Sequence, residues 1–213
     1  MAYDKNIPLP VIKRLPRYHR FLGAIKEKGV VRISSGELSK QMGLTASQIR
    51  QDLNCFGGFG QQGYGYNVES LYNEIGLILG VNDKKKAILI GAGNLGQAIA
   101  RHMSFEKWGF ELTGIFDSNP ELFDKEIKGL RVLGSDSIES FCALNSPALA
   151  ILCVPNTDEV EELTEKLVKA GIKAFWNFTH IDIRAKHPEI FVENVHLSDS
   201  LVTLCYQLNQ NEI

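Results

Sequence analysis

The sequence predicts an α/β protein: an N-terminal winged helix-turn-helix domain, then a Rossmann dinucleotide-binding domain and a C-terminal helix. Three observations support this fold class. Two short capped helices meet at Gly43, a segment rich in glycine and tyrosine follows them, and residues 86–117 combine an apolar strand, the glycine pattern GAGNLG, a helix and a second strand that ends on an acid. The expected domains cover residues 1–80 and 81–196, and the C-terminal helix covers residues 197–213.

The first expected helix covers Val11–Lys28. It follows two prolines, and its apolar residues recur at near-helical spacing while basic residues occupy other parts of the helix surface. Pro16 is expected to mark the first turn of this helix or a kink in it. The apolar residues are Leu15, Phe21, Leu22 and Ile25, and the basic ones are Arg14, Arg17, Arg20 and Lys26.

Two capping boxes predict the next two helices. Ser34 and Glu37 have the spacing of the first box, which opens a short helix closed by Gly43. Thr45 and Gln48 form the second box, at the start of the segment SQIRQDLNCF. Two capped helices with so short a turn predict a helix-turn-helix, although the same spacing occurs in ordinary helical bundles.

The second helix of this pair is the expected DNA-reading helix. Ile49, Leu53 and Phe56 can face the core. The residues left on the outer face carry amide, hydroxyl and guanidinium groups suited to base edges and phosphates: Ser47, Gln48, Arg50, Gln51 and Asn54.

The segment Gly57–Tyr66 favours a DNA-binding domain over a plain bundle. It reads GGFGQQGYGY, and its glycines are typical of a tight β-hairpin, here with aromatic supports. A hairpin after a reading helix is a wing that can reach the adjacent minor groove. The alternative is a flexible glycine loop, because the segment has no alternating apolar pattern. Asn67 is expected to cap one more helix, Val68–Leu79, with its apolar residues facing inward.

The glycine pattern Gly91-Ala-Gly93-Asn-Leu-Gly96 lies between an apolar strand and a helix. The first glycine permits the tight turn, the second lets the backbone approach a pyrophosphate, and the third brings helix and strand close together. Asp117 follows Gly96 by 21 positions, where an acid accepts hydrogen bonds from both hydroxyls of an adenosine ribose. A 2′-phosphate would meet the charge of this acid, so the pattern favours NAD(H) over NADP(H).

Apolar runs predict the remaining elements of the nucleotide domain. We expect strands over Leu149–Val154, Ile172–Phe178 and Phe191–Val195, and a helix over Thr157–Lys169. Ligands of such sheets bind outside the carboxyl ends of the strands, so residues at two of these ends are expected near a nicotinamide. They are Val154, Pro155 and Asn156 at one end, and Asn177, Phe178 and Thr179 at the other.

The last expected helix starts near Ser198 and carries an apolar stripe. The stripe consists of Leu201, Leu204, Cys205 and Leu208. A terminal helix this apolar needs a covering surface. Its own Rossmann sheet is one candidate, and a partner subunit is the other.

Charge and cysteine usage add broader expectations. Residues 1–80 carry 10 Lys and Arg against 6 Asp and Glu, whereas residues 81–213 carry 13 against 19, so the two parts are expected to have different partners. The four cysteines form no CxxC pair or zinc pattern, which predicts reduced, mostly buried thiols and no metal site. The start has no apolar signal core and no run is long enough to cross a bilayer, so we expect a soluble, cytoplasmic protein.

A series of short motifs runs along the chain: KRLPRYHR, RISSGELS, TASQIRQDL, FGQQGYGYNVE, IGAGNLGQAI, FDSNP, GIKAFWNF and VENVHLSDSL. Their order resembles the Rex family of redox-sensing transcriptional repressors, from about Ile12 to the C-terminus. The resemblance implies a homodimer that binds palindromic operator DNA and is released by NADH, while NAD⁺ leaves it bound or competes weakly. It also implies that the terminal helix swaps onto the partner subunit and that the targets are genes of fermentative and anaerobic NADH reoxidation.

Specific site residues follow from these arguments. The expected cofactor-binding residues are Gly91, Ala92, Gly93, Asn94, Leu95, Gly96, Asp117, Ser118, Pro155, Asn177 and Phe178, and the resemblance supports Pro155, Asn177 and Phe178 near the nicotinamide. The expected DNA-binding residues are Arg14, Arg17, Ser47, Gln48, Arg50, Gln51, Asn54, Gln61, Gln62 and Tyr64. Some relatives carry Tyr and Asp at about the places of His102 and His196, in a redox-sensing network with an N-terminal Arg for which Arg20 is the candidate. The two histidines depart from that pattern.

An enzyme is not expected. A dehydrogenase needs a proton donor or acceptor and orienting groups beside its cofactor, and the 213 residues leave no segment for a substrate domain. Two alternatives stay open: a small NAD-dependent reductase with an N-terminal oligomerisation module, and a coenzyme A site in the Rossmann domain. Asp117, placed to bind a free ribose, argues against coenzyme A, whose ribose carries a 3′-phosphate.

Overall fold

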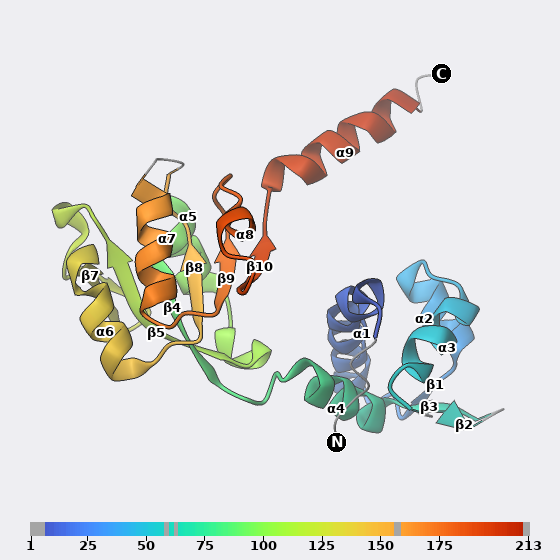
Figure 1. Cartoon of the computed structure of the whole chain (residues 1–213). Helices are drawn as coiled ribbons and strands as arrows, with labels where there is room; N and C mark the ends of the chain where they lie inside the picture. The colour runs from blue at the N-terminus through green and yellow to red at the C-terminus, as the bar shows by residue number, and fades with distance from the viewer. Residues whose placement is uncertain (1–6, 58–59, 62–63, 156–158, 211–213) are drawn as a thin grey trace. The chain divides into compact units, whose positions relative to one another are not determined.

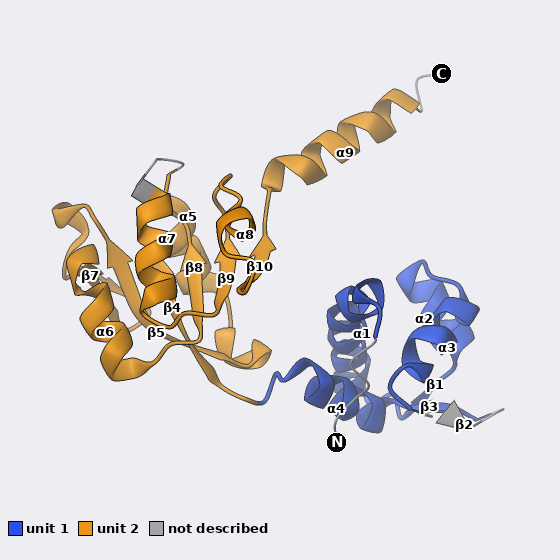
Figure 2. Ribbon diagram, viewed as in Figure 1, with its two compact units in different colours: residues 1–82 blue, residues 83–213 orange. Residues whose placement is uncertain are grey.

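The computed structural model describes residues 7–57, 60–61, 64–155 and 159–210. The chain divides into two compact units, residues 1–82 and 83–213, which Figure 2 shows in blue and orange. Each unit has a hydrophobic core of its own, as a domain requires.

Unit 1 is a winged helix-turn-helix domain. Its helices are α1 (Leu9–Glu27), α2 (Ser35–Met42), α3 (Ala46–Asn54) and α4 (Val68–Leu79), and its strands are β1 (Arg32–Ile33), β2 (Gly60–Gln61) and β3 (Gly65–Asn67). Strands β2 and β3 form the antiparallel hairpin expected after the reading helix, and β1 pairs with the other side of β3 (Figure 1). The wing prediction is confirmed, although residues 58–59 and 62–63 lie outside the described part of the chain.

Helix α1 contains Pro16 in its interior rather than in its first turn. Pro10 occupies the first turn, where its missing N–H would have no helical partner in any case. An interior proline removes one helical hydrogen bond and costs about 3 kcal/mol, so tertiary packing must hold this helix together. Leu15, Tyr18 and Leu22 provide that packing, since all three are almost fully buried.

The expected end signals of the next helices are largely confirmed. The Ser34 hydroxyl accepts from the Glu37 N–H at 3.1 Å while the Glu37 carboxylate accepts from the Ser34 N–H at 2.8 Å, which completes the first capping box. Gly43 ends α2 with a left-handed φ of 63°. The second box is only half formed. Thr45 accepts from the Gln48 N–H at 3.1 Å, but the Gln48 side chain binds Asp52 instead of the Thr45 backbone.

Unit 2 has a seven-stranded sheet between two layers of helices. The strand order is β10-β9-β8-β4-β5-β7-β6, and all pairs are parallel except β6 with β7. The strands are β4 (Lys85–Ile90), β5 (Phe110–Asp117), β6 (Glu126–Ile127), β7 (Leu130–Gly134), β8 (Leu149–Leu152), β9 (Ala174–Asn177) and β10 (Phe191–Asn194). The helices are α5 (Asn94–His102), α6 (Ile138–Asn145), α7 (Glu159–Lys169), α8 (Ile183–Lys186) and α9 (Leu197–Gln210), with 3-10 turns η1 (Phe105–Trp108), η2 (Pro120–Leu122) and η3 (Ser135–Ser137).

The sheet is buried on both faces, as parallel sheets are. Ile88 and Ile90 of β4 belong to the core that includes α6, α7 and α8, whereas Ala87 and Leu89 belong to the opposite core with α5 and η1. Because successive side chains of a strand point to opposite faces, β4 supplies both cores. Its carboxyl end lies in the middle of the sheet, between β5 and β8.

The expected strands at the end of the chain are confirmed, with shorter bounds. They correspond to β8, β9 and β10. The predicted start of α7 at Thr157 lies outside the described residues. Strands β6 and β7 and helix α6 were not expected, because they are only 2, 5 and 8 residues long.

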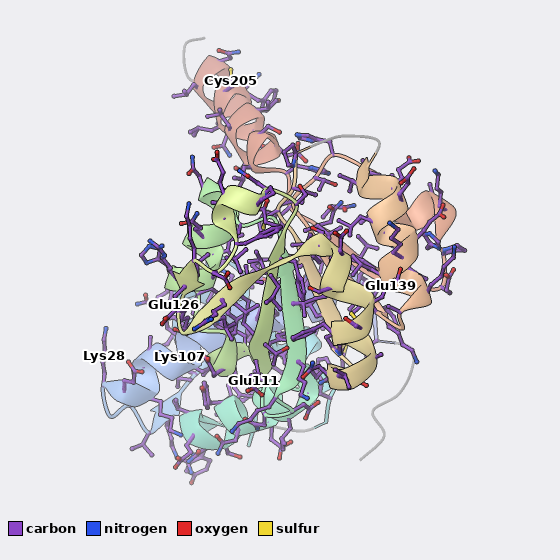
Figure 3. All side chains as sticks on the ribbon, turned by 90° about the vertical axis from the view of Figure 1, so that its left-hand side faces the viewer. Lys28, Lys107, Glu111, Glu126, Glu139 and Cys205 are labelled. Carbon is purple, nitrogen blue, oxygen red and sulfur yellow. The ribbon has the colours of Figure 1, made fainter. Side chains whose placement is uncertain are left out.

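Helix α9 stands apart from both cores of unit 2. All of its residues are exposed, including Leu201 at 68%, Leu204 at 50% and Leu208 at 59%. Figure 1 shows α9 leaving the sheet after β10, and Figure 3 shows Cys205 on it, away from the rest of the unit. The alternative in which this helix covers its own Rossmann sheet is therefore wrong. Among the described helices, neither α9 nor any other has the length and apolar content of a membrane span.

The expectation of mostly buried cysteines is wrong at two positions. Cys55 and Cys205 are exposed, Cys142 is buried and Cys153 is half-buried, and all four are free thiols. Burial raises the pKa of the Cys153 thiol to about 12. The apolar stripe of α9 suggests burial for Cys205, but no surface among the described residues covers it.

Unit 1 is predicted to lose stability as the pH falls below about 6.5, the unperturbed pKa of histidine. His19 is 4% exposed and stacks on Tyr72 at a ring-centroid distance of 4.1 Å, which joins α1 to α4. Burial lowers the pKa of His19, so the unfolded chain takes up a proton at a pH where the folded chain does not. The stability that neutral His19 contributes is complete above the pKa of this histidine in the unfolded chain. It is lost as the pH falls toward the lower pKa of the folded chain.

Urea unfolding, followed through the amide NMR signals of α1 and α4 between about pH 5 and pH 8, measures this loss. In His19→Phe, which keeps a flat ring against Tyr72, the free energy of unfolding should vary less over this range. His102→Asn, at the exposed end of α5, should keep the parent profile. An unchanged profile in His19→Phe would assign the pH dependence to another group.

Candidate dinucleotide site and nucleic-acid interface

The glycine loop, residues 91–96, joins the carboxyl end of β4 to α5. Gly91 has a φ of +96°, and a Cβ there would lie 2.6 Å from the Cys153 carbonyl oxygen, so only glycine fits beside the end of β8. A Cβ on Gly96 would lie 1.8 Å from the Gly91 carbonyl oxygen. The first and last glycines thus serve the turn and the close packing of helix on strand.

Gly93 has a different environment. A Cβ there would meet nothing within 4 Å, and its φ of −70° is open to any residue. Internal packing gives no reason for glycine at this position, whereas a pyrophosphate approaching the backbone from outside does. Gly93 caps α5 without a side-chain acceptor, so the first-turn N–H groups and the positive end of the helix dipole are available to an anion.

Asp117 lies beside this loop, at the carboxyl end of β5. Its Oδ2 accepts from the Ala92 N–H at 2.6 Å and its Oδ1 accepts from the Asn119 N–H at 2.8 Å, so backbone donors fix the carboxylate. A carboxylate accepts about four hydrogen bonds, which leaves capacity on each oxygen for a ribose hydroxyl. The loop and the acid therefore form the geometry that the glycine pattern predicts.

The other expected cofactor residues differ in their exposure. Asn94, Leu95, Ser118 and Pro155 are exposed, and Ala92 is buried with its N–H bound to Asp117. Phe178 is half-buried and meets the Trp176 ring edge to face, at a centroid distance of 4.7 Å. The expected neighbour Asn156 lies outside the described residues.

The Asn177 side chain is committed to the protein interior. It is fully buried, and its Nδ2 donates to the Ile181 carbonyl at 3.0 Å and to Asn194 Oδ1 at 2.9 Å. Its Oδ1 accepts from both the N–H and the hydroxyl of Thr179, at 3.0 and 2.8 Å. An amide has two donors and two acceptor sites, so all four are used. The Asn177 side chain therefore ties β9 to β10, and its place near a nicotinamide stays a prediction.

The two histidines that depart from the family pattern lie in different surroundings. His102 is exposed at the end of α5. His196 precedes α9 and stacks on His180, with parallel rings at a centroid distance of 5.4 Å. Its Nδ1 is buried and has no hydrogen-bond partner within the described chain.

On the reading helix α3, the core face is confirmed and the outer face is mostly exposed. Ile49 and Leu53 of α3 are buried, and so is Phe56, two residues past the end of the helix. Ser47, Arg50, Gln51 and Asn54 are exposed, whereas Gln48 is half-buried. The Arg50 guanidinium donates to the Ser35 hydroxyl at 3.0 Å, which links the first turn of α2 to the outer face of α3.

Asp52 is a buried charge that the sequence patterns did not indicate. It is 0% exposed, and Arg14 binds it through two hydrogen bonds of 2.6 Å each. The Tyr18 hydroxyl and the Gln48 amide donate to the same carboxylate, each at 2.8 Å. Burial alone would raise the pKa of Asp52, but the donors outweigh it and hold that pKa below its usual value.

Two arginines of α1, both expected DNA contacts, bind acceptors within unit 1. The Nε and Nη2 donors of the Arg14 guanidinium both bind Asp52, so Arg14 joins α1 to α3. Arg17 donates to the Met42 carbonyl at 2.5 Å and so helps to close the end of α2. The contact of Arg14 with DNA stays a prediction.

The wing contributes one expected residue and one that was missed. Tyr64 is 69% exposed. Arg32 of β1 lies over its ring, 5.9 Å from the centroid, and donates to the Tyr64 carbonyl at 3.3 Å. A two-residue strand gives no periodic signal, so sequence patterns did not predict that Arg32 lies at the wing. Gln62 lies outside the described residues, and Gln61 is described only as part of β2.

Two family models match the chain: "Putative DNA-binding protein N-terminus" over residues 6–54 and "CoA binding domain" over residues 82–181. The redox-sensing transcriptional repressor Rex of Thermoanaerobacter pseudethanolicus is 54% identical over 213 residues, covering 100% of this chain and 94% of the relative. The Rex repressor of Clostridium perfringens strain 13 is 51% identical, with 100% of both chains covered.

Solved structures agree with these relatives. A crystal structure of RSP with NAD⁺ and operator DNA has a TM-score of 0.90 and 55% identity, covering 98% of this chain and 95% of that one. A structure of RSP with NADH has a TM-score of 0.88 and 52% identity, covering 98% and 97%. A winged DNA-binding domain joined to a dinucleotide fold defines a transcription regulator that responds to a nucleotide. This chain belongs to the Rex family of redox-sensing transcriptional repressors.

Asp117→Ala is predicted to weaken NADH binding strongly and to narrow its advantage over NADPH. Loss of a charged acceptor costs about 1.5 to 3 kcal/mol, roughly a tenfold to 150-fold loss of affinity. Calorimetric titration with NADH and with NADPH measures both effects. The matched control is Asn119→Ala, which removes the neighbouring side chain that caps η2 and should leave the affinity for NADH close to that of the parent. Unchanged NADH affinity in Asp117→Ala would show that the acid does not hold the ribose.

Proposed function

We propose that this protein is a redox-sensing repressor that binds a palindromic operator as a homodimer and releases it when NADH binds. The observation that carries this proposal is the similarity along 98% of the chain to RSP structures described as complexes with NADH and, separately, with NAD⁺ and operator DNA. A cytoplasmic location follows, because operator DNA and the nicotinamide pool meet there.

The cofactor assignment to NAD(H) is supported by the glycine loop and the acid. Gly93 leaves the backbone open to a pyrophosphate, and the Asp117 carboxylate has capacity for two ribose hydroxyls. One matching family model is named for coenzyme A, but a 3′-phosphate on the ribose would meet the charge of Asp117. NAD⁺ and NADH differ by one positive charge and in ring planarity. Only a difference in their affinity for two protein states can shift the protein between them.

The DNA contacts are assigned to α3 and the wing. Ser47, Arg50, Gln51 and Asn54 are the exposed side chains of the reading helix, with Gln48 at its edge. Tyr64 and Arg32 lie at the wing, and Gln61 and Gln62 remain predicted DNA contacts from the sequence. Because these glutamines are neutral, we expect fewer phosphate ion pairs and a shallower salt dependence than for a basic wing.

The homodimer is supported by α9. Its apolar stripe is exposed in the isolated chain, and a stripe of this kind marks an interaction surface. A second copy of the chain is the occupant that the family resemblance implies, with the helix crossing between subunits. Two-fold symmetry then places one reading helix on each of two half-sites, which explains a palindromic operator.

Titration of a fluorescently labelled palindromic duplex at several NADH to NAD⁺ ratios tests the proposal. The duplex is the one that the parent protein enriches from random DNA. Anisotropy should fall as the NADH fraction rises, because released DNA tumbles faster. Asp117→Ala should keep DNA binding but lose much of the response to NADH, whereas Arg50→Ala should lose operator preference but keep NADH affinity. Turnover of NADH with carbonyl compounds, without any effect of NADH on DNA binding, would instead support the reductase alternative.

Deletion of the chain after Ser198 is predicted to dissolve the dimer and with it the symmetric binding of the operator. The deletion removes Leu201, Leu204 and Leu208. Without these residues to bury against the partner subunit, the equilibrium between dimer and monomer shifts toward the monomer. Sedimentation velocity measures the oligomeric state. Ser200→Ala, which changes a polar residue of the same helix, should remain a dimer. A truncated protein that still sediments as a dimer and still releases its operator with NADH would contradict the role given to α9.

A further inference from the structure

Gln48 lies at the boundary between a buried polar cluster and the reading surface. It is in the first turn of α3, the part of a reading helix that enters the major groove. Its side chain is half-buried, and its Nε2 donates to Asp52 Oδ1 at 2.8 Å. The two residues are four positions apart on the helix, so their side chains are neighbours.

Asp52 is itself held rigidly. Arg14 binds both carboxylate oxygens and the Tyr18 hydroxyl binds Oδ2, so with Gln48 the carboxylate receives four hydrogen bonds, about its full capacity. Arg14 and Tyr18 belong to α1, and Tyr18 is 1% exposed. The anchor for the Gln48 amide is therefore a fixed group of the domain core and not a mobile surface side chain.

The chemistry of this anchor sets the polarity of the amide. An ionised carboxylate only accepts hydrogen bonds, so the nitrogen of the Gln48 amide must face Asp52 and the oxygen cannot take its place. One N–H and the Oε1 remain for another partner. A free glutamine can turn its amide over and offer two donors, whereas this one presents a donor and an acceptor together.

We propose that Asp52 is a positioning residue for base recognition, which holds Gln48 as a fixed donor and acceptor pair that selects adenine and rejects guanine. In the major groove adenine offers the N7 acceptor and the N6 donor, which match this pair, whereas guanine offers acceptors at both N7 and O6. A fixed Oε1 would face O6 without a proton between them. This inference rests on the proposed DNA-binding function and identifies the base preference of one position on its reading surface.

The test measures base preference at every position of the half-site. The duplex enriched by the parent protein is substituted one base pair at a time, in both half-sites, and affinities are measured by anisotropy. Gln48→Ala should lose about fivefold to 150-fold of adenine-over-guanine preference at one position and little elsewhere. Gln41→Ala, which removes an exposed amide on α2 with no assigned DNA contact, is the matched control and should keep that preference.

Asp52→Asn should lose the same preference at the same position, because an asparagine can donate or accept and lets the Gln48 amide turn over. The loss should not add to that of Gln48→Ala in the double variant. A purely structural role for Asp52 predicts something different: a uniform loss of affinity for all duplexes, which adds to the effect of Gln48→Ala. Either of those results would overturn the inference.

A second measurement needs no change at Asp52 and remains decisive if Asp52→Asn does not fold. Side-chain amide ¹⁵N relaxation in the free parent protein should show the Gln48 amide as rigid as the backbone and the Gln51 amide as mobile. Equal mobility of the two amides would overturn the inference. If the parent protein enriches no duplex from random DNA, the proposed function itself fails. If it enriches one but Gln48→Ala keeps every preference, only this inference fails.

Discussion

The buried Asp52 carboxylate is the interaction on which the DNA-binding unit most depends. It is 0% exposed, and its donors come from two helices, with Arg14 and Tyr18 on α1 and Gln48 on α3. Removing one partner of such a pair leaves an uncompensated charge and costs about 3 to 5 kcal/mol. This cost is a large part of the free energy of unfolding of an ordinary domain, which is roughly 5 to 15 kcal/mol. The angle between α1 and the reading helix is therefore fixed by polar geometry as well as by the apolar core.

A carboxylate has a comparable position in the nucleotide unit. Asp117 is tied by the Ala92 N–H to the loop that it is proposed to serve, and Gly91 and Gly96 leave that loop no space for a Cβ. In both units the rigid contacts are internal. Three places have a surface that the unit itself does not contact: the open side of Gly93, the outer edge of Gln48 and the apolar stripe on α9. These are places where a ligand or a partner would bring the missing contacts.

Sequence patterns predicted the elements whose signals are local. Capping residues located α2, α3 and α4, and the glycine spacing located the dinucleotide loop, because each of these depends on residues within one turn or one strand-helix unit. Patterns could not show that Arg14 binds Asp52, 38 residues away, or that Asn177 uses its amide on Asn194. Basic and amide side chains look alike in a sequence whether they face water or a buried partner. The four-residue spacing of Gln48 and Asp52 was a usable signal of contact between their side chains. It would have weakened the prediction that Gln48 completes the second capping box.

Coupling between nucleotide and operator requires an element that has two arrangements of similar free energy. The glycine loop is unsuited to this, since its first and last glycines have no alternative packing. The Asp52 cluster is unsuited as well, because its four hydrogen bonds would be lost together. Helix α9 has no such constraint within its own unit, because its apolar residues are exposed there and their contacts depend on a partner. If NADH weakens operator binding through this helix, operator must weaken NADH binding by the same factor. The repressor would then report the NADH to NAD⁺ ratio with an affinity that depends on whether its operator is occupied.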